Sequence, residues 1–326
     1  MQNMHTPQIT DLSRKQKNKC VKKYNFITDI LRNPVSYILI LPAMAYSFIF
    51  SYMTLPYIII AFQKFNYKLG ILHSPWVGFK NFEFFFKSPR FPLVTFNTLK
   101  FNFLFILIGV ILSVTFAILL NEIRLKWFMK LAQSTFIFPH FLSWVVISYI
   151  VYALFSTDYG IINQFLVSVG LETKNWYSDP GPWTWILVGL RMWKDTGIQV
   201  IIYLAAITGI DRELYEAAMI DGANRWQQIK SITIPMLMTT VCILALLSIG
   251  KMFYGDFGMI YSIIRDNGIL YPTTDVIDTY VFRVLRKTGD PSQAMAVGLY
   301  QAFMGFILVF GSNWFANKYF KDGALF

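Results

Sequence analysis

A short polar segment lies between two long apolar stretches in the second half of the chain. Residues 216–222 read EAAMIDG, and residues 232–235 read ITIP after nine intervening positions. The segment presents two carboxylates, two adjacent alanines and a glycine. Adjacent alanines leave a shallow surface that the backbone of another protein could approach closely. These residue types favour contact with a partner protein, although an ordinary linker helix between two membrane spans would also fit.

The residues around this segment predict a short helix. Asp211 can cap its N-terminus, and Glu213 falls in the first turn, where negative charge complements the helix dipole. Gly222 is the expected end, because glycine readily adopts the left-handed conformation that terminates helices. Pro235 is placed where the next apolar stretch begins, since a proline in the first turn costs no hydrogen bond. We therefore expect a helix that lies across the membrane face and is connected to two spans.

Charged and polar residues inside the apolar stretches are a second candidate for chemistry. The positions are Arg191, Trp193, Lys194, Asp195, Ser248, Lys251 and Tyr254. Ionisable side chains in a bilayer face a cavity or a partner more often than lipid. On a helix, Arg191, Lys194 and Asp195 share a face. They either line a path for polar molecules or pair with neighbouring groups, and the residue types alone leave both open.

The composition indicates a chain that is solvated by lipid. Apolar residues make up 55% of the 326 residues, aromatic residues 18% and charged residues only 14%, against about 25% charged in soluble domains. The net charge of +11 could suggest nucleic acid, but cationic flanks of membrane spans explain it better. We expect a membrane protein that contacts lipid and no nucleic acid.

Six apolar stretches are long enough to cross a bilayer, which takes about twenty residues. They lie at about 37–62, 93–120, 132–155, 183–208, 234–254 and 294–317. In lipid they must be helices, because every backbone polar group has to be satisfied internally. The expected fold is an all-α polytopic inner-membrane protein with a transmembrane domain at 34–326. An uncleaved basic tail at 1–33 precedes it, and the distribution of Lys and Arg places both termini in the cytoplasm.

Residues 216–218, Gly222, Ile232, Ile234 and Pro235 resemble the EAA loop of ABC importer permeases. These are bacterial inner-membrane subunits that work with a solute-binding protein. The one departure is Ile234, where the family more often has leucine. The resemblance implies the type I ABC importer permease fold and a coupling loop at 209–235 that docks into a cleft on an ATPase subunit. It assigns the coupling contacts to Glu216, Ala217, Ala218, Asp221, Gly222, Ala223, Ile232 and Pro235.

Three further segments extend the resemblance over nearly the whole chain. Residues 77–82 (VGFKNF) and 159–164 (YGIINQ) resemble outer-loop signatures of sugar-type permeases, and residues 276–283 (VIDTYVFR) resemble the LplB-like branch. That branch handles complex oligosaccharides or polysaccharide fragments. The resemblance implies that the seven polar positions contact cargo, and their surplus of cations hints at an anionic, uronic-acid saccharide of the alginate or pectin kind. Local pairing of Lys194 and Asp195, with Trp193 as a packing residue, stays the alternative.

The chain is expected to be a non-catalytic pore subunit. It has no glycine-rich nucleotide loop, because Gly250-Lys251 is followed by Met252 and lacks the upstream glycine. ATP and Mg would therefore bind to partner subunits, and we expect no cofactor or metal on this chain. The expected partners are a paralogous permease, two ATP-binding cassette subunits and an extracytoplasmic solute-binding protein.

Two other classes of protein fit the sequence less well. A secondary carbohydrate transporter without an ATPase partner often shows matched broken spans at mid-membrane, and no such pair is evident here. A membrane-embedded glycan enzyme would need acids or histidines that converge at one depth, which is not evident either. Transport driven by a separate ATPase is the reading that also explains the EAA loop.

Overall fold

The structure, a computed structural model, describes residues 32–319, and the regular elements in that range are helices, with no β-strand. A single antiparallel bridge joins Gln63 and Trp76. The expected all-α fold is confirmed. The predicted tail at 1–33 lies almost entirely outside the described residues.

The elements follow one another without long gaps. In chain order they are α3 (Pro34–Ser47), η1 (Phe48–Tyr52), η2 (Leu55–Phe62), α4 (Gly70–His73), α5 (Lys80–Phe86), α6 (Phe91–Asn121), α7 (Lys126–Ile137), η3 (Phe138–Phe141), α8 (Trp144–Phe155), α9 (Ile161–Ser168), η4 (Trp176–Ser178), α10 (Trp183–Thr208), α11 (Arg212–Ile220), α12 (Arg225–Gln228), η5 (Ile229–Thr233), α13 (Ile234–Ile249), α14 (Phe257–Ile264), α15 (Tyr271–Thr274), α16 (Ile277–Thr288) and α17 (Pro291–Tyr319).

Four helical runs among the described residues are long and apolar enough to cross a membrane. They are Pro34–Phe62, Phe91–Asn121, Arg225–Ile249 and Pro291–Trp314, and the bent pair of α7–η3 with α8 would make a fifth. α10 is 26 residues long, but Arg191, Lys194 and Asp195 lie within it, so composition alone does not class it as a span. The six expected spans are compatible with this arrangement.

The chain divides into two compact units, Met1–Tyr57 and Ile58–Phe326. In the first unit, α3 begins with Pro34 in its first turn and has no buried residue. Its side chains are apolar, and Leu39 is 75% exposed. Such a surface suits lipid or another apolar protein surface.

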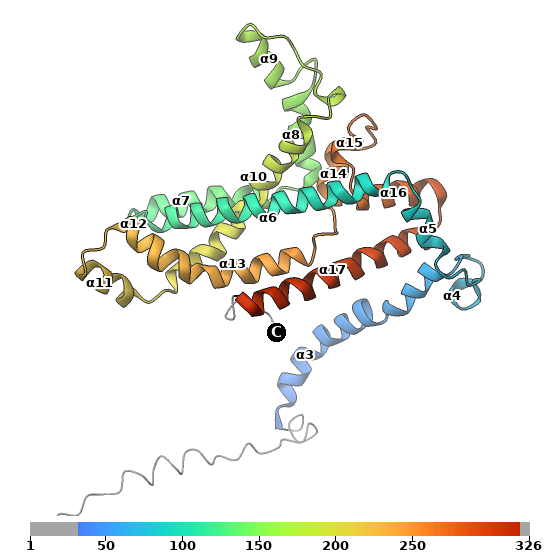
Figure 1. The fold of residues 1–326 in the computed structure, drawn as a ribbon, viewed down its shortest axis with the longest axis horizontal. Coiled ribbons are helices and arrows are strands. Elements are labelled where there is room, and N and C mark those ends of the chain that lie inside the picture. The colour runs from blue at the N-terminus through green and yellow to red at the C-terminus, as the bar shows by residue number, and fades with distance from the viewer. Residues whose placement is uncertain (1–31, 320–326) are drawn as a thin grey trace, which may run out of the picture. The chain divides into compact units, whose positions relative to one another are not determined.

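The second unit is organised around α6 and α10, which pack against each other (Figure 1). α13 contacts α6, α10 and α17. α6 enters all three apolar clusters of the unit, through Phe101, through Ala117 and Leu120, and through Val94. A long helix that reaches every cluster fixes the positions of the shorter elements around it.

The stretch expected to cross as one span at 132–155 is a bent pair of helices. The run α7–η3 and the helix α8 meet at 97°. The α-helix ends just before Pro139, whose ring cannot continue α-helical hydrogen bonding. After the turn, the Ser143 hydroxyl caps α8 by accepting a hydrogen bond from Val146 N at 3.3 Å. A proline and a capping serine therefore divide one apolar stretch into two helices.

The bend leaves backbone carbonyls without helical partners, and a buried lysine of α10 binds them. Lys194 is only 8% exposed. Its Nζ donates to the carbonyl oxygens of His140 at 2.6 Å and of Leu142 at 2.7 Å, and it lies 5.4 Å from the centre of the Trp144 ring. An unsatisfied backbone group in hydrocarbon costs several kcal/mol, so these two bonds stabilise the bend.

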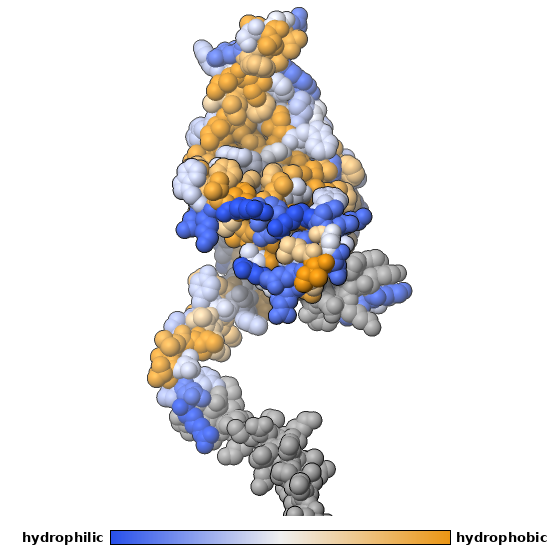
Figure 2. Space-filling model, turned by 90° about the vertical axis from the view of Figure 1, so that its left-hand side faces the viewer, coloured by the Kyte–Doolittle hydropathy of each residue, from blue (hydrophilic) through white to orange (hydrophobic). Residues whose placement is uncertain are grey.

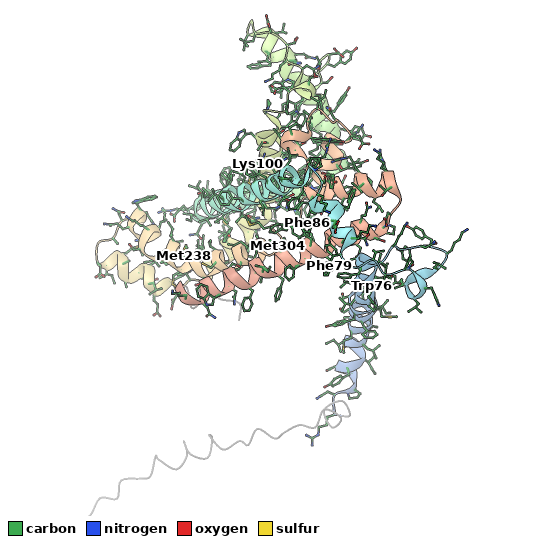
Figure 3. All side chains as sticks on the ribbon, turned by 45° about the vertical axis from the view of Figure 1, so that its right-hand side comes forward. Trp76, Phe79, Phe86, Lys100, Met238 and Met304 are labelled. Atoms are coloured by element: carbon green, nitrogen blue, oxygen red, sulfur yellow. The ribbon has the colours of Figure 1, made fainter. Side chains whose placement is uncertain are left out.

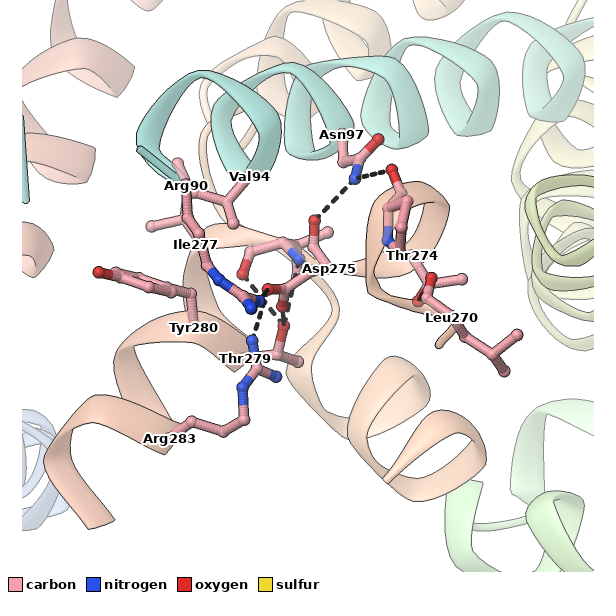
Figure 4. A network of polar contacts seen from close by, with 12 residues as sticks. Arg90, Val94, Asn97, Leu270, Thr274, Asp275, Ile277, Thr279, Tyr280 and Arg283 are labelled. Carbon is pink, nitrogen blue, oxygen red and sulfur yellow. Dashed lines mark hydrogen bonds and ion pairs between the residues drawn. The ribbon is translucent and has the colours of Figure 1, made fainter. Parts of the chain in front are cut away.

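A second network fixes the segment before α16 to the start of α6 (Figure 4). The fully buried side chain of Asp275 pairs with Arg283 and accepts a hydrogen bond from Thr279 Oγ1 at 2.7 Å. Asn97 of α6 donates through Nδ2 to the Asp275 carbonyl oxygen at 3.1 Å, and Ile277 N donates to Thr98 Oγ1 at 3.0 Å. A buried charge is tolerated because it is paired and hydrogen-bonded.

Aromatic rings hold the segment that leads into α6. The ring of Phe62 stacks on Trp76, with centroids 5.6 Å apart, and meets Phe79 edge-on at 5.5 Å. Figure 3 shows Trp76, Phe79 and, further along the chain, Phe86 in this segment. The side-chain amide of Asn81 donates to the Ala61 and Gln63 carbonyl oxygens, so the loop before α6 is ordered by the chain itself.

α7 and α10 approach most closely at Gly197. A Cβ added there would overlap the carbonyl oxygen of Phe136 in α7, whereas at Gly189 of the same helix it would meet no atom within 4 Å. We predict that Gly197→Ala lowers the free energy of unfolding by about 1–3 kcal/mol, the usual range for overpacking.

Gly189→Ala is the matched control, and it should be neutral or slightly stabilising because alanine is the better helix former. The measurement is the Tm of the purified full chain in detergent. Equal Tm values for the two variants would contradict the close contact between α7 and α10.

Candidate functional site

The helix expected in the EAA loop is α11, and local hydrogen bonds define both of its ends. The Asp211 side chain caps it by accepting from Glu213 N at 3.0 Å. At the other end Gly222 adopts φ +81°. Gly222 N donates to Met219 O at 3.1 Å and Ala223 N to Ala218 O at 2.8 Å, the paired bonds of a glycine-terminated helix.

α11 presents most of its surface to the outside of the chain. It has no buried residue, and the exposed fraction is 50% for Met219 and 87% for Ile220. Figure 2 shows a band of hydrophilic side chains on the face of the second unit that carries α11 and α12. A bond of 2.9 Å between Tyr215 Oη and Thr233 Oγ1 ties α11 to η5. α11 is therefore a capped, exposed helix with a side-chain connection to the next span.

The helix that follows begins earlier than the sequence indicated. The fifth span was expected at 234–254, but α12, η5 and α13 form one run from Arg225 to Ile249. Asn224 starts it with a capping box, in which its side chain accepts from Gln227 N at 2.9 Å. The wide π-type turns of η5 directly precede Pro235, which lies in the first turn of α13. This local widening accommodates a proline, which cannot donate to the preceding turn.

The residues expected to make the coupling contacts are divided between a cavity and the surface around it. Glu216 lines a cavity of about 280 Å³ between α11 and α12, together with Arg212, Arg225 and the buried Gln228. The Glu216 carboxylate forms no ion pair with residues 32–319. The remaining members lie outside this cavity: Ala217, Asp221 and Gly222 are exposed, Ala218 and Ala223 are half-buried, Ile232 lies in η5 and Pro235 in α13.

A polar cavity of about 470 Å³ lies between α6, α10 and α13. It brings together four of the seven positions that were expected to contact cargo, namely Arg191, Asp195, Ser248 and Lys251. Trp193, Lys194 and Tyr254 do not line it. The helical face defined by i, i+4 spacing explains the grouping, because Arg191, Asp195 and Gln199 follow one another along one side of α10.

The charges of the polar cavity are largely paired within the chain. Arg191 Nε lies 2.8 Å from Asp195 Oδ2, and a second guanidinium nitrogen pairs with Asp256. Asp195 Oδ1 also lies 3.1 Å from His140 Nδ1. Lys251 is exposed and forms no ion pair with the described residues. Lys251 is therefore a cation of the cavity whose charge is not compensated by the described part of the chain.

The three other cargo candidates have different surroundings. Lys194 binds the carbonyls of the bend, as described above, so local pairing accounts for it. Trp193 is 46% exposed and lines an apolar groove on the side of α10 that faces α7. Tyr254 follows the end of α13, and its carbonyl oxygen accepts from Asn102 Nδ2 at 2.9 Å. The structure thus separates residues that are neighbours in the sequence.

The residues after α13 are anchored from two sides. Asp256 pairs with Arg191 of α10, and the adjacent Gly255 N donates to Asp278 Oδ2 at 2.5 Å. Gln301 of α17 donates to the same carboxylate oxygen at 3.1 Å. Burial raises the pKa of Asp278, which lies in α16 outside the membrane spans. These bonds connect the exit of α13 to α10, α16 and α17.

Several residues of the polar cavity were not among the candidates. Asn102 and Gln199 line it, and His140 reaches it through Asp195. The signal for Gln199 was present in the sequence, since it continues the i, i+4 series of Arg191 and Asp195. His140 is connected to the cavity only through its contact with Asp195, which lies 55 positions further along the chain. No local sequence pattern reveals such a contact. Among residues 32–319, no three His, Cys, Asp or Glu side chains are grouped to hold a metal ion.

The chain is similar to known transport proteins over nearly its whole length. Protein LplB of Bacillus subtilis (strain 168) is 33% identical over 302 residues, which are 93% of this chain and 94% of LplB. The polygalacturonan/rhamnogalacturonan transport system permease protein YteP of the same organism is 35% identical with the same coverage.

Solved structures show the same likeness. A chain of a bacterial ABC transporter involved in the import of the acidic polysaccharide alginate matches with a TM-score of 0.80 and 30% identity, over 90% of this chain and 98% of that one.

A family model described as the binding-protein-dependent transport system inner membrane component matches residues 106–320. This chain therefore belongs to the family of inner membrane components of binding-protein-dependent transport systems, the permease subunits of ABC transporters.

Proposed function

We propose that the chain is one permease half of an ATP-driven importer that takes up oligosaccharides or polysaccharide fragments. The observation that carries this proposal is the similarity over more than nine-tenths of the chain to YteP, a permease named for polygalacturonan and rhamnogalacturonan transport. The transporter named for alginate import supports the same class of cargo. The second half of the path would be a paralogous permease.

The EAA loop supports the ATP-driven mechanism. α11 is rigidly capped, is exposed, and joins α10 to the run of α12 and α13 through short connections. In the proposed mechanism α11 docks on an ATP-binding cassette subunit, which binds the ATP and Mg. Closure of the ATPase dimer moves α11, and α10 and α13 reorient around the polar cavity. Cargo arrives on an extracytoplasmic solute-binding protein at the outer loops, and both termini of this chain lie in the cytoplasm.

The charge of the cargo is a finer proposal that rests on Lys251. Asp195 and Asp256 compensate the positive charge of Arg191. The cavity therefore has a smaller surplus of positive charge than the residue types along the sequence suggested. Lys251 remains available for a carboxylate. We propose that it binds the carboxylate of a uronic-acid residue, while Ser248 and the amides of Asn102 and Gln199 bind hydroxyl groups.

The proposed function is tested by reconstitution in liposomes with the paralogous permease, the ATPase and the binding protein. Uptake of labelled oligogalacturonides or alginate oligosaccharides should require ATP inside the vesicles, the binding protein outside them and both permeases. Uptake that proceeds without the ATPase and follows a proton or sodium gradient would instead indicate a secondary transporter.

We predict that Glu216→Ala reduces import and cargo-stimulated ATP hydrolysis, because it removes the exposed carboxylate at the proposed docking surface. Loss of a central interface residue costs about 2 kcal/mol or more, equivalent to roughly thirtyfold weaker docking. Glu213→Ala, on the first turn of the same helix, is the matched control. The measurement is the ATPase rate and uptake in the reconstituted system; equal rates for the two variants would remove Glu216 from the coupling contact.

We also predict that Lys251→Met impairs import, whereas Lys194→Met impairs the stability of the fold. Lys251→Met should lower import of uronic-acid oligosaccharides with little change in Tm, because its ammonium group is exposed. Lys194→Met should lower the Tm instead, because it leaves the His140 and Leu142 carbonyls unsatisfied, at about 1–3 kcal/mol for each buried polar group. For Lys251→Met, the measurement compares uptake of a uronic-acid oligosaccharide with uptake of a neutral oligosaccharide. Equal loss of import for charged and neutral cargo in Lys251→Met would contradict the carboxylate contact.

A further inference from the structure

An apolar groove of about 520 Å³ lies between α6, α7 and α10, next to the bend at Pro139. Its walls include Phe116 of α6, Phe128 and Leu131 of α7, and Trp193 of α10. Thr135 and Thr196 also line it, and the Thr135 hydroxyl is already bonded to the Leu131 carbonyl oxygen at 2.9 Å. The buried Thr196 hydroxyl has no hydrogen-bond partner among the described residues. The rest of the lining is apolar, so the groove suits a hydrocarbon occupant.

The length of the groove matches one leaflet of a bilayer. The residues of α7–η3 that line it run from Phe128 to Pro139. At 1.5 Å per residue this stretch covers about 17 Å, close to the roughly 15 Å that is half the hydrocarbon thickness. An acyl chain that entered at the first turn of α7 would end near the bend.

Positive charge is concentrated where the groove begins. Arg124, Lys126 and Lys130 are exposed, and Glu122 is the acidic residue in this stretch, so the net charge of these four residues is +2. No side chain caps the N-terminus of the twelve-residue α7, where the helix dipole favours an anion. Trp127 is 74% exposed, as expected for an aromatic residue at the membrane interface. The apolar groove thus begins beside exposed basic residues and an uncapped helix N-terminus.

We propose that this groove binds one acyl chain of an anionic phospholipid, with the phosphate at the first turn of α7 near Arg124 and Lys126. A helix of the partner permease is the other candidate occupant. Lipid is favoured because a phosphate matches the uncapped helix end and the basic residues, and because the groove length matches a leaflet. The inference goes beyond the proposed function, since the bound molecule is not cargo and neither Arg191 nor Lys251 lines the groove.

The first experiment is native mass spectrometry of the purified full chain, titrated with dioleoyl phosphatidylglycerol or dioleoyl phosphatidylcholine. One phosphatidylglycerol should bind in preference to phosphatidylcholine. Arg124→Gln with Lys126→Gln should weaken this binding about thirtyfold, equivalent to about 2 kcal/mol for two basic residues near an anionic headgroup. Arg225→Gln with Lys230→Gln removes the same charge from α12 and η5 and should leave binding unchanged. Equal binding of the two lipids, or equal effects of the two double variants, would overturn the proposal.

The second experiment is carried out in native membranes and needs no delipidation. Phosphatidylglycerol with a photoreactive group at the end of one acyl chain should crosslink to the segment 135–139. Thr135→Trp, which fills the groove, should abolish this crosslink while the size-exclusion profile of the protein stays monodisperse. A photoreactive residue at position 135 that crosslinks to the partner permease instead of lipid would show that a protein helix covers the groove, and would overturn the proposal.

Discussion

The bond between the Lys194 ammonium group and two backbone carbonyls is the interaction on which the rest of this structure depends. A span that breaks in hydrocarbon exposes polar backbone groups, which membrane proteins tolerate only where other groups satisfy them. Here the break at Pro139 is satisfied by a side chain of α10 and by the Ser143 cap. Because the break is stable, α7 can lie against α10 at Gly197. α10 then forms a wall of both the apolar groove and the polar cavity.

α10 thereby carries three kinds of contact on adjacent residues. Arg191 and Asp195 face the polar cavity, Trp193 faces the apolar groove, and Lys194 faces the bend. Successive residues of an α-helix are rotated by about 100°, so three neighbours in the sequence can serve three environments. The ion pairs of Arg191 with Asp195 and Asp256 also link α10 to the segment after α13. A movement of α10 is therefore connected to the end of the neighbouring span.

Local signals predicted much of this arrangement. Asp211 and Gly222 define the ends of α11 because capping and a positive φ are properties of a few adjacent residues. The predicted stretch 183–208 has the same bounds as α10, because the turn residues on either side of it can also be recognised from a few adjacent positions. The bend within 132–155 and the earlier start of the fifth span depend on partners elsewhere in the fold: Lys194 satisfies the bend from more than fifty positions away. The grouping of Arg191, Asp195, Ser248 and Lys251 likewise needs the packing of α13 against α10. The family resemblance pointed to segments of the two spans, and it could not show that Trp193 and Tyr254 lie outside the cavity.

The wide turns of η5 have a mechanical consequence. In a π-type stretch the hydrogen-bonded rings are larger, so this part of a helix resists bending and twisting less than the α-helical segments on either side. η5 lies between the capped α12 and the membrane-spanning α13, and the Tyr215 hydroxyl attaches α11 at Thr233, the last residue of that compliant stretch. In the proposed mechanism, a movement of α11 would therefore reach the chain at Thr233, next to the first residue of α13, and would bypass most of η5.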